Sequence, residues 1–212
     1  MLEKMKDFIS AHLDFKFYGV TWIALAVGLS IIPSLMYVPQ KYGYENGLYE
    51  SIQMVVLFGI MAMCLTAQVN KRFFKFAALA LTIIMIREVN CGRTLFFHIP
   101  GTENSYYPWR EIKYGYLVHP IYGTYIGIIG LIFLCKKLYL DMWKMIKNIK
   151  LPVWNLLFMG IASFCGAIAE KATNNNFIFE EGFELLFYVA LAGIVYLYSR
   201  HENFAIEQND EI

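Results

Sequence analysis

The stretch FYGVTWIALAVGLSIIPSLMYV, residues 17–38, runs for 22 residues without a charged side chain. A helix needs about 20 mostly apolar residues to cross the roughly 30 Å hydrocarbon core of a bilayer. Charged residues make up only 17% of the 212-residue chain, whereas a typical soluble domain has about 25%. The stretch therefore predicts a transmembrane helix in a chain built for an apolar environment.

Five more segments of the chain are long and apolar: residues 49–69, 74–95, 120–138, 152–171 and 182–199. With residues 17–38 they predict an all-α polytopic membrane protein, in which residues 17–200 form one bundle of six transmembrane helices. Residues 1–16 alternate apolar and charged side chains at helical spacing, which predicts a short amphipathic helix on the membrane surface. Residues 201–212 are predicted to be a polar cytoplasmic tail.

Lysine and arginine residues are concentrated in the connections on one side of these spans. Short cytoplasmic loops of membrane proteins carry an excess of these residues. Twelve lie in the N-terminal segment, around Lys71, in residues 136–150 and at Arg200, while the opposite loops hold three, Lys41, Arg110 and Lys113. We therefore expect a multi-pass protein of the cell membrane with both termini in the cytoplasm. The net charge of +1 implies no attraction to nucleic acid.

Ionisable side chains inside the predicted spans are the strongest functional signal. Each costs about 2.5–3.5 kcal/mol at the centre of a transmembrane helix, so it is a functional candidate by default. These residues gather at the predicted outer ends of the spans, and the inner half has few polar side chains. We expect a blind, outward-facing pocket at the depth of lipid headgroups, with candidate catalytic residues Glu184, Glu50 and Glu88. The candidate ligand-binding residues are Arg87, Asn90, Arg93, His119, Glu170, Lys171 and Tyr188.

The adjacent residues Arg87 and Glu88 allow a specific expectation about pairing. Neighbouring residues point about 100° apart on a helix. We therefore expect each of them to find its own partner on another segment. The candidate partners are Glu50 or Glu184 for Arg87, and Lys171 or Arg93 for Glu88.

Carboxylates outnumber the cations in this predicted cluster. Such an excess calls for raised carboxyl pKa values, a bound cation or a cationic ligand, so a divalent cation is a candidate cofactor. No metal-binding spacing such as HxxxH or HExxH is present. For Glu180 and Glu181 a structural explanation competes, because acidic residues are stabilised at a helix N-terminus.

Small residues recur at helical spacing in two spans. The fourth contains Gly123-x-x-x-Gly127, and the fifth contains Gly160, Ser163 and Gly166. Small residues let helix backbones approach closely in membranes, so these two spans are predicted to be central packing helices. A homo-oligomer formed through Gly123 and Gly127 is the alternative.

Three functions fit these patterns. The first is a protein that binds or processes a lipid, or another extracytoplasmic polar ligand, in the outward-facing pocket, with membrane lipids as its partners. The second is an oligomeric ion channel or transporter subunit, which would need a polar path through the apolar inner half. The third is a membrane scaffold or regulatory partner whose ionic network is purely structural. Neither an enzymatic reaction nor its absence follows from these patterns.

The predicted orientation can be tested by cysteine labelling in intact cells. After substitution by cysteine, Ser105 should react with an impermeant reagent from outside, and Lys144 should react only after permeabilisation. The reverse pattern would reject the orientation and the assignment of the pocket to the outer leaflet.

Overall fold

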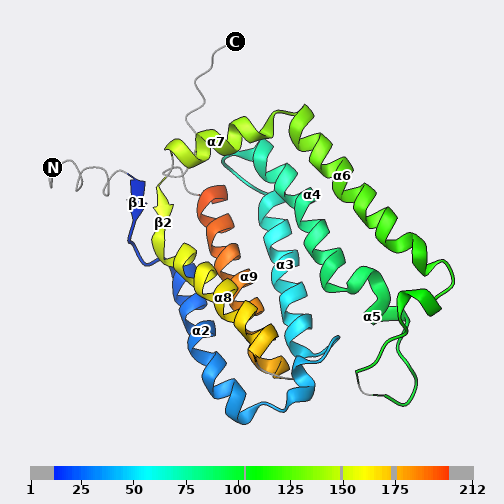
Figure 1. Ribbon diagram of the computed structural model, residues 1–212. Coiled ribbons are helices and arrows are strands. Elements are labelled where there is room, and N and C mark those ends of the chain that lie inside the picture. Colours follow the sequence, from blue (N-terminus) through cyan, green and yellow to red (C-terminus); the bar gives the residue numbers. More distant parts are fainter. Residues whose placement is uncertain (1–11, 103, 149, 173–175, 201–212) are drawn as a thin grey trace.

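Six long helices alternate in direction in the computed structural model, which describes residues 12–102, 104–148, 150–172 and 176–200 (Figure 1). They are α2 (Gly19–Tyr37), α3 (Leu48–Leu65), α4 (Lys71–Glu88), α6 (Val118–Cys135), α8 (Val153–Ala172) and α9 (Phe177–Arg200). Two shorter helices connect them, α5 (Arg93–Phe96) and α7 (Leu138–Asn148), and α7 lies across one end of the bundle. The predicted all-α class is confirmed.

Four helical stretches of the described chain are long and apolar enough to cross a membrane. They are Gly19–Tyr37, Gln40–Leu65, Gly115–Cys135 and Phe177–Arg200. The apolar part of α8, Val153–Ala169, is shorter, and α4 carries charged residues at both ends. These lengths and compositions indicate a membrane protein.

Helix α9 forms the centre of the bundle. It packs against α2, α3 and α8, while α4 packs on the outside of α3 (Figure 1). Of the span Phe177–Arg200, 44% is buried, compared with 6% of the span Gly115–Cys135. The predicted central role of the fifth span agrees with the packing of α8 against α9, whereas that of the fourth span is wrong.

The reason is that the small-residue face of α6 has no neighbour. A Cβ atom added at Gly123 or Gly127 would meet nothing within 4 Å. Instead, α6 contacts α4 through tyrosines: the Tyr122 hydroxyl donates a hydrogen bond to the Ile83 carbonyl oxygen at 2.9 Å. Aromatic side chains hold the two backbones apart here, so α6 lies at the edge of the bundle.

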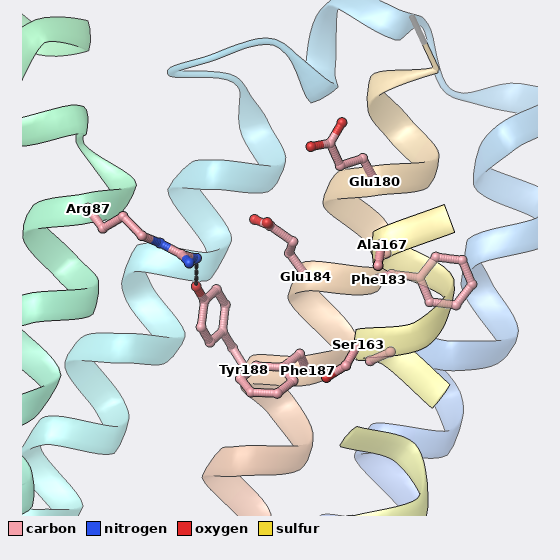
Figure 2. A pocket seen from close by; sticks show the side chains of 10 residues that line it. Arg87, Ser163, Ala167, Glu180, Phe183, Glu184, Phe187 and Tyr188 are labelled. Carbon is pink, nitrogen blue, oxygen red and sulfur yellow. Dashed lines mark hydrogen bonds between the residues drawn. The ribbon is translucent and has the colours of Figure 1, made fainter. Parts of the chain in front are cut away.

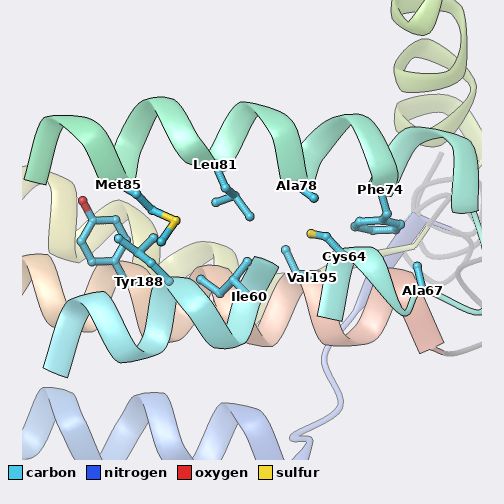
Figure 3. Close-up of a cluster of buried hydrophobic side chains, with 10 residues drawn as sticks. Ile60, Cys64, Ala67, Phe74, Ala78, Leu81, Met85, Tyr188 and Val195 are labelled. Carbon is cyan, nitrogen blue, oxygen red and sulfur yellow. The ribbon is translucent and has the colours of Figure 1, made fainter. Parts of the chain in front are cut away.

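A buried apolar cluster joins α3, α4 and α9 (Figure 3). On α4 it consists of Phe74, Ala78, Leu81 and Met85, which are spaced three or four residues apart. This spacing places all four on one face of the helix. Lipid chains are as apolar as these side chains, so close packing rather than exclusion from water holds the face against α3.

The third predicted span ends earlier than expected. Helix α4 stops at Glu88, and Asn90, Cys91 and Gly92 have φ angles of 44°, 52° and 86°. This left-handed backbone cannot continue a right-handed helix. The turn η2 (Asn90–Gly92) therefore separates α4 from α5, and Arg93 lies beyond the span.

The N-terminal segment is tied to α8. Strand β1 (Leu13–Asp14) pairs in parallel with β2 (Leu151–Pro152), and the Trp154 indole N–H donates to the Phe15 carbonyl oxygen at 2.9 Å. Residues 13 and 14 are thus extended, and the predicted amphipathic helix does not reach residue 16. Its remainder, residues 1–11, and the predicted tail, residues 201–212, lie outside the described residues.

A buried polar contact joins α2, α8 and α9. The Thr21 hydroxyl donates to Asn155 Oδ1 at 2.7 Å, and Asn155 Nδ2 donates to the Ala190 carbonyl oxygen at 3.4 Å. Thr21 and Asn155 are almost fully buried. A Cβ atom added at Gly193 would lie 2.1 Å from Asn155 Nδ2. One glycine therefore makes room for the amide that links α2, α8 and α9.

We expect Gly193→Ala to lower the melting temperature of the purified protein. The new methyl group displaces Asn155 from both of its partners, and overpacking of this kind costs about 1–3 kcal/mol. Gly160→Ala is the matched control, because its methyl group meets nothing within 4 Å. Equal melting temperatures for the two variants would contradict the assigned contact.

Candidate functional site

A pocket with a volume of about 280 Å³ lies where α9 is flanked by α8 and α4 (Figure 2). It is lined by Arg87, Ala162, Ser163, Gly166, Ala167, Glu180, Phe183, Glu184, Phe187 and Tyr188. We refer to this as the α8–α9 pocket. Three of the predicted site residues, Arg87, Glu184 and Tyr188, are among its lining residues.

The spacing of the lining residues explains the position of the pocket. On α9 the residues from Glu180 to Tyr188 are three or four positions apart and share one face. On α8 the facing residues are small, among them Ser163, Gly166 and Ala167. Small side chains leave open the space that larger ones would fill. The pocket therefore forms because a face of α9 with large side chains lies opposite a face of α8 with small ones.

The lining combines apolar and ionisable groups. Phe183 and Phe187 supply aromatic surface, while Glu180, Glu184 and Arg87 supply charges of both signs. Figure 2 shows Glu180 and Glu184 above Tyr188, with Arg87 reaching across from α4. Such a lining accommodates a ligand that has both an apolar part and a charged part.

Tyr188 holds the end of α4 against α9. Its hydroxyl donates to Glu88 Oε1 at 2.7 Å and accepts a hydrogen bond from Arg87 Nη2 at 3.2 Å. Arg87 Nη2 also lies 2.7 Å from Glu88 Oε1. The Glu88 side chain is 7% exposed and that of Arg87 is 63% exposed. Glu88 is thus occupied by this contact, whereas the Arg87 guanidinium keeps an open side toward the pocket.

The expected partners of Glu88 are wrong, because Arg87 and Glu88 pair with each other. Arg87 also interacts electrostatically with Glu184, one of its two expected partners, but Glu88 is its close ion-pair partner. Their Cα–Cβ bonds do diverge on the helix. Long side chains bridge that divergence, and Glu88 is the last residue of α4, where no further turn intervenes. The Tyr188 hydroxyl forms hydrogen bonds with both side chains.

The α8–α9 pocket lies beside the N-terminal third of α9. Glu184 follows the first residue of α9, Phe177, by seven positions, which corresponds to about 10 Å along the helix axis. The whole helix has 24 residues, or about 36 Å. In the predicted orientation, Glu180 is close to the boundary between headgroups and hydrocarbon, and Glu184 is about one helical turn deeper.

A second polar group lies between α3 and α9. Glu50 is 8% exposed, and its Oε2 accepts the backbone N–H of Asn46. Gln53 is fully buried, and its Nε2 donates to the Glu181 carbonyl oxygen at 3.0 Å and to Glu181 Oε2 at 2.8 Å. Glu50, predicted as catalytic, is therefore buried beside the pocket and does not line it.

A third polar group lies in the loops after α2 and α4. Arg93 Nη2 is 3.8 Å from Glu45 Oε1, and the Asn90 amide oxygen, when turned toward Arg93, accepts from Arg93 Nη2 at 2.6 Å. The Tyr106 hydroxyl donates to the Glu45 carbonyl oxygen at 3.0 Å, and burial raises the pKa of Tyr106. The predicted ligands Asn90 and Arg93 thus belong to this loop region.

These loops surround a second pocket of about 460 Å³, which we call the loop pocket. Its lining residues are Lys41, Tyr42, Tyr44, Glu45, Asn46, Gly47, Thr94, His98 and Tyr106. Asn46 connects it to the buried group, because its backbone N–H binds Glu50.

The remaining predicted residues lie away from the α8–α9 pocket lining. His119 is exposed at the start of α6, with its ring 6.4 Å from that of Trp109. Lys171 is exposed near the end of α8, and the side chain of Glu170 is outside the described part of the structure. No three His, Cys, Asp or Glu side chains among the described residues converge to hold a metal ion by themselves.

Some pocket residues were not among the predicted site residues. Glu180 lies in the first turn of α9, as expected for an acidic residue at a helix N-terminus, and it also lines the pocket. Phe183 and Phe187 are apolar, so the search for polar side chains inside the spans did not select them. Their spacing from Glu180 and Glu184, at three and four positions, is the sequence signal that places them on the same face.

Comparisons with family models, with curated proteins and with solved structures found no match to this chain. Its function therefore has to be argued from the residues of the site.

Replacement of Tyr188 by phenylalanine tests the contact between α4 and α9. The loss of a hydrogen bond to a charged group costs about 1.5–3 kcal/mol, so Tyr188→Phe should lower the melting temperature. Tyr37→Phe is the control, because Tyr37 is 80% exposed. Parent-like melting of Tyr188→Phe would show that the hydroxyl contributes nothing to the bundle.

Proposed function

We propose that this chain is a six-span membrane protein with cytoplasmic termini, and that its α8–α9 pocket binds the headgroup of a membrane lipid from the outer leaflet. Helices α4 and α8 would supply the two spans beyond the four that meet the length and composition of a membrane helix. The alternating direction of the six long helices supports this topology (Figure 1).

The observation that carries the proposal is the mixed lining of the pocket. Glu180 and Glu184 suit an ammonium group, and the open side of Arg87 suits a phosphate. Phe183 and Phe187 offer aromatic faces, which attract cations and pack against apolar chains. A zwitterionic phospholipid has these groups in one molecule.

Exposure of the α8 wall supports entry from the bilayer. Ser163 and Ala167 are exposed, and α8 forms the outside of the bundle at this point. A lipid could therefore enter sideways without first leaving the membrane. The buried Thr21–Asn155 contact in the inner half favours a pocket that is closed toward the cytoplasm.

If the bound headgroup is also processed, Glu184 is the residue placed to act as the general base. Its carboxylate lines the pocket. The other two candidate catalytic residues, Glu50 and Glu88, are buried and hydrogen-bonded to Asn46 and to Tyr188.

The open glycine face of α6 favours an oligomeric channel or transporter subunit as a second candidate. Gly123 and Gly127 have no neighbour within 4 Å of an added Cβ, and small residues support close helix pairs in membranes. In this candidate the homo-oligomer, through Gly123 and Gly127, would place the conduction path between subunits.

Binding of phosphatidylethanolamine to the full chain tests the lipid proposal. Native mass spectrometry should show more retained phosphatidylethanolamine than phosphatidylglycerol, which lacks the ammonium group. Glu184→Gln should weaken retention about tenfold, because a charge-assisted hydrogen bond is worth about 1.5–3 kcal/mol. Its melting temperature should stay close to that of the parent, since the amide preserves the shape of the side chain.

A steric variant provides an independent test of the same pocket. Ala167→Leu should fill the pocket and abolish retention, while Ala26→Leu, on an exposed face of α2, should leave it unchanged. Equal retention by the parent, Ala167→Leu and Glu184→Gln would reject the lipid site. Parent-like lipid retention combined with melting losses would favour a structural ionic network.

A further inference from the structure

The buried group between α3 and α9 contains an oxygen atom without a hydrogen-bond donor. Gln53 is fully buried, and Nε2 donates both of the hydrogen bonds that link its side chain to Glu181. Its carbonyl oxygen Oε1 is inaccessible to water and has no donor in the described structure. An unsatisfied buried acceptor costs about 1–3 kcal/mol. A group that binds to Oε1 would remove this cost.

Two carboxylates lie beside this amide. Gln53 points at Glu181, and Glu50 is one turn before Gln53 on the same face of α3. Glu181 and Glu50 interact electrostatically with each other. Neither forms an ion pair with a cation of the described residues, where Arg87 pairs with Glu88 and Arg93 with Glu45.

A single ligand type would satisfy the amide oxygen and both carboxylates. Water does not reach Oε1 in this packing, and a water molecule could not neutralise the carboxylates. A hard metal cation can do both, because carboxylate and amide oxygens are the ligands that such ions prefer. We propose that Glu50, Gln53 and Glu181 form a binding site for an oxygen-coordinated cation, with Ca²⁺ as the ion that fits best.

Charge and coordination chemistry favour Ca²⁺ over other ions. Two carboxylates supply a charge of −2, which one divalent ion balances. Mg²⁺ usually keeps several of its waters and demands near-ideal octahedral geometry, which suits a buried site poorly. Zn²⁺ prefers histidine and cysteine ligands, and the three side chains of this site provide oxygen ligands only.

The position of the site provides an entry route for the cation and lets a bound cation stabilise the contact between α3 and α9. Glu50 is hydrogen-bonded to Asn46, which lines the loop pocket, so the ion can arrive from the loop side. Glu50 and Gln53 belong to α3 and Glu181 to α9. A bound cation therefore links the central helix to a neighbour, and a ligand that binds only the folded state raises its stability.

This inference does not depend on lipid binding in the α8–α9 pocket. The test uses the full chain purified in detergent and passed through a chelator. Its melting temperature should rise saturably by several degrees with CaCl₂, but not with MgCl₂ or with choline chloride at equal ionic strength. Equilibrium dialysis with radioactive calcium should show one bound ion per chain.

Two variants keep the test specific. Glu181→Gln and Gln53→Leu should each weaken calcium binding at least tenfold, whereas Glu111→Gln, on a solvent-exposed loop residue, should bind like the parent. Dialysis measures the folded protein directly, so a lowered melting temperature in Gln53→Leu does not obscure the result. Binding unchanged in both site variants, or no saturable response to CaCl₂, would overturn the proposal. A saturable response to NaCl instead, lost in both variants, would assign a monovalent ion and reject Ca²⁺.

Discussion

Polar side chains between membrane helices must find their partners inside the protein, because hydrocarbon offers none. In this chain α9 meets that constraint at three depths. Glu181 meets Gln53 near the N-terminal end of α9, and Tyr188 meets Glu88 two turns further along. Further toward the C-terminal end of α9, the Ala190 carbonyl oxygen accepts a hydrogen bond from Asn155. Each contact comes from a different neighbouring helix, so the arrangement of α3, α4 and α8 around α9 is set by polar pairs as well as by packing.

The same constraint separates polar groups that hold helices together from polar groups that line the pocket. Glu88 has its carboxylate committed to Arg87 and Tyr188, and Asn155 has its amide committed to Thr21 and α9. Arg87 keeps an exposed side, and Glu184 lines a pocket. In the pair of Arg87 and Glu88, the carboxylate is buried and the guanidinium is exposed. The buried contact therefore orients Arg87, whose exposed side faces the pocket.

Much of the fold could be predicted from residue type and order. Runs of apolar residues located the six long helices, because the length of a run reflects membrane thickness. The predicted ends lie within five residues of the observed ones, except the end of α4, which comes seven residues early. The end of α4 could not be predicted, since the left-handed backbone at Asn90 and Cys91 occurs at residues that are compatible with a helix. The prediction that α6 is a central packing helix failed because the spacing of its glycines shows only that another helix can approach closely. It does not show whether a neighbouring helix is present.

The candidate site was predictable in part for similar reasons. The predicted depth of each residue along its helix placed Arg87, Glu184 and Tyr188 in one site, and all three line the α8–α9 pocket. Residues at equal depth on adjacent helices lie close together. The predicted depth did not separate these three from Asn90 and Arg93, which lie in the loops beyond α4. Pairing between neighbours in sequence, as in Arg87 and Glu88, depends on side-chain reach, and helical geometry alone does not determine it.

The central position of α9 also has a consequence for biogenesis. Ribosomes make this helix after all the helices that surround it, so those helices must wait in the membrane with Gln53, Glu88 and Asn155 still lacking their partners on α9. The link between Trp154 and Phe15 likewise joins residues 139 positions apart. A partly synthesised chain therefore holds these polar groups without their partners on α9 until that helix is in place.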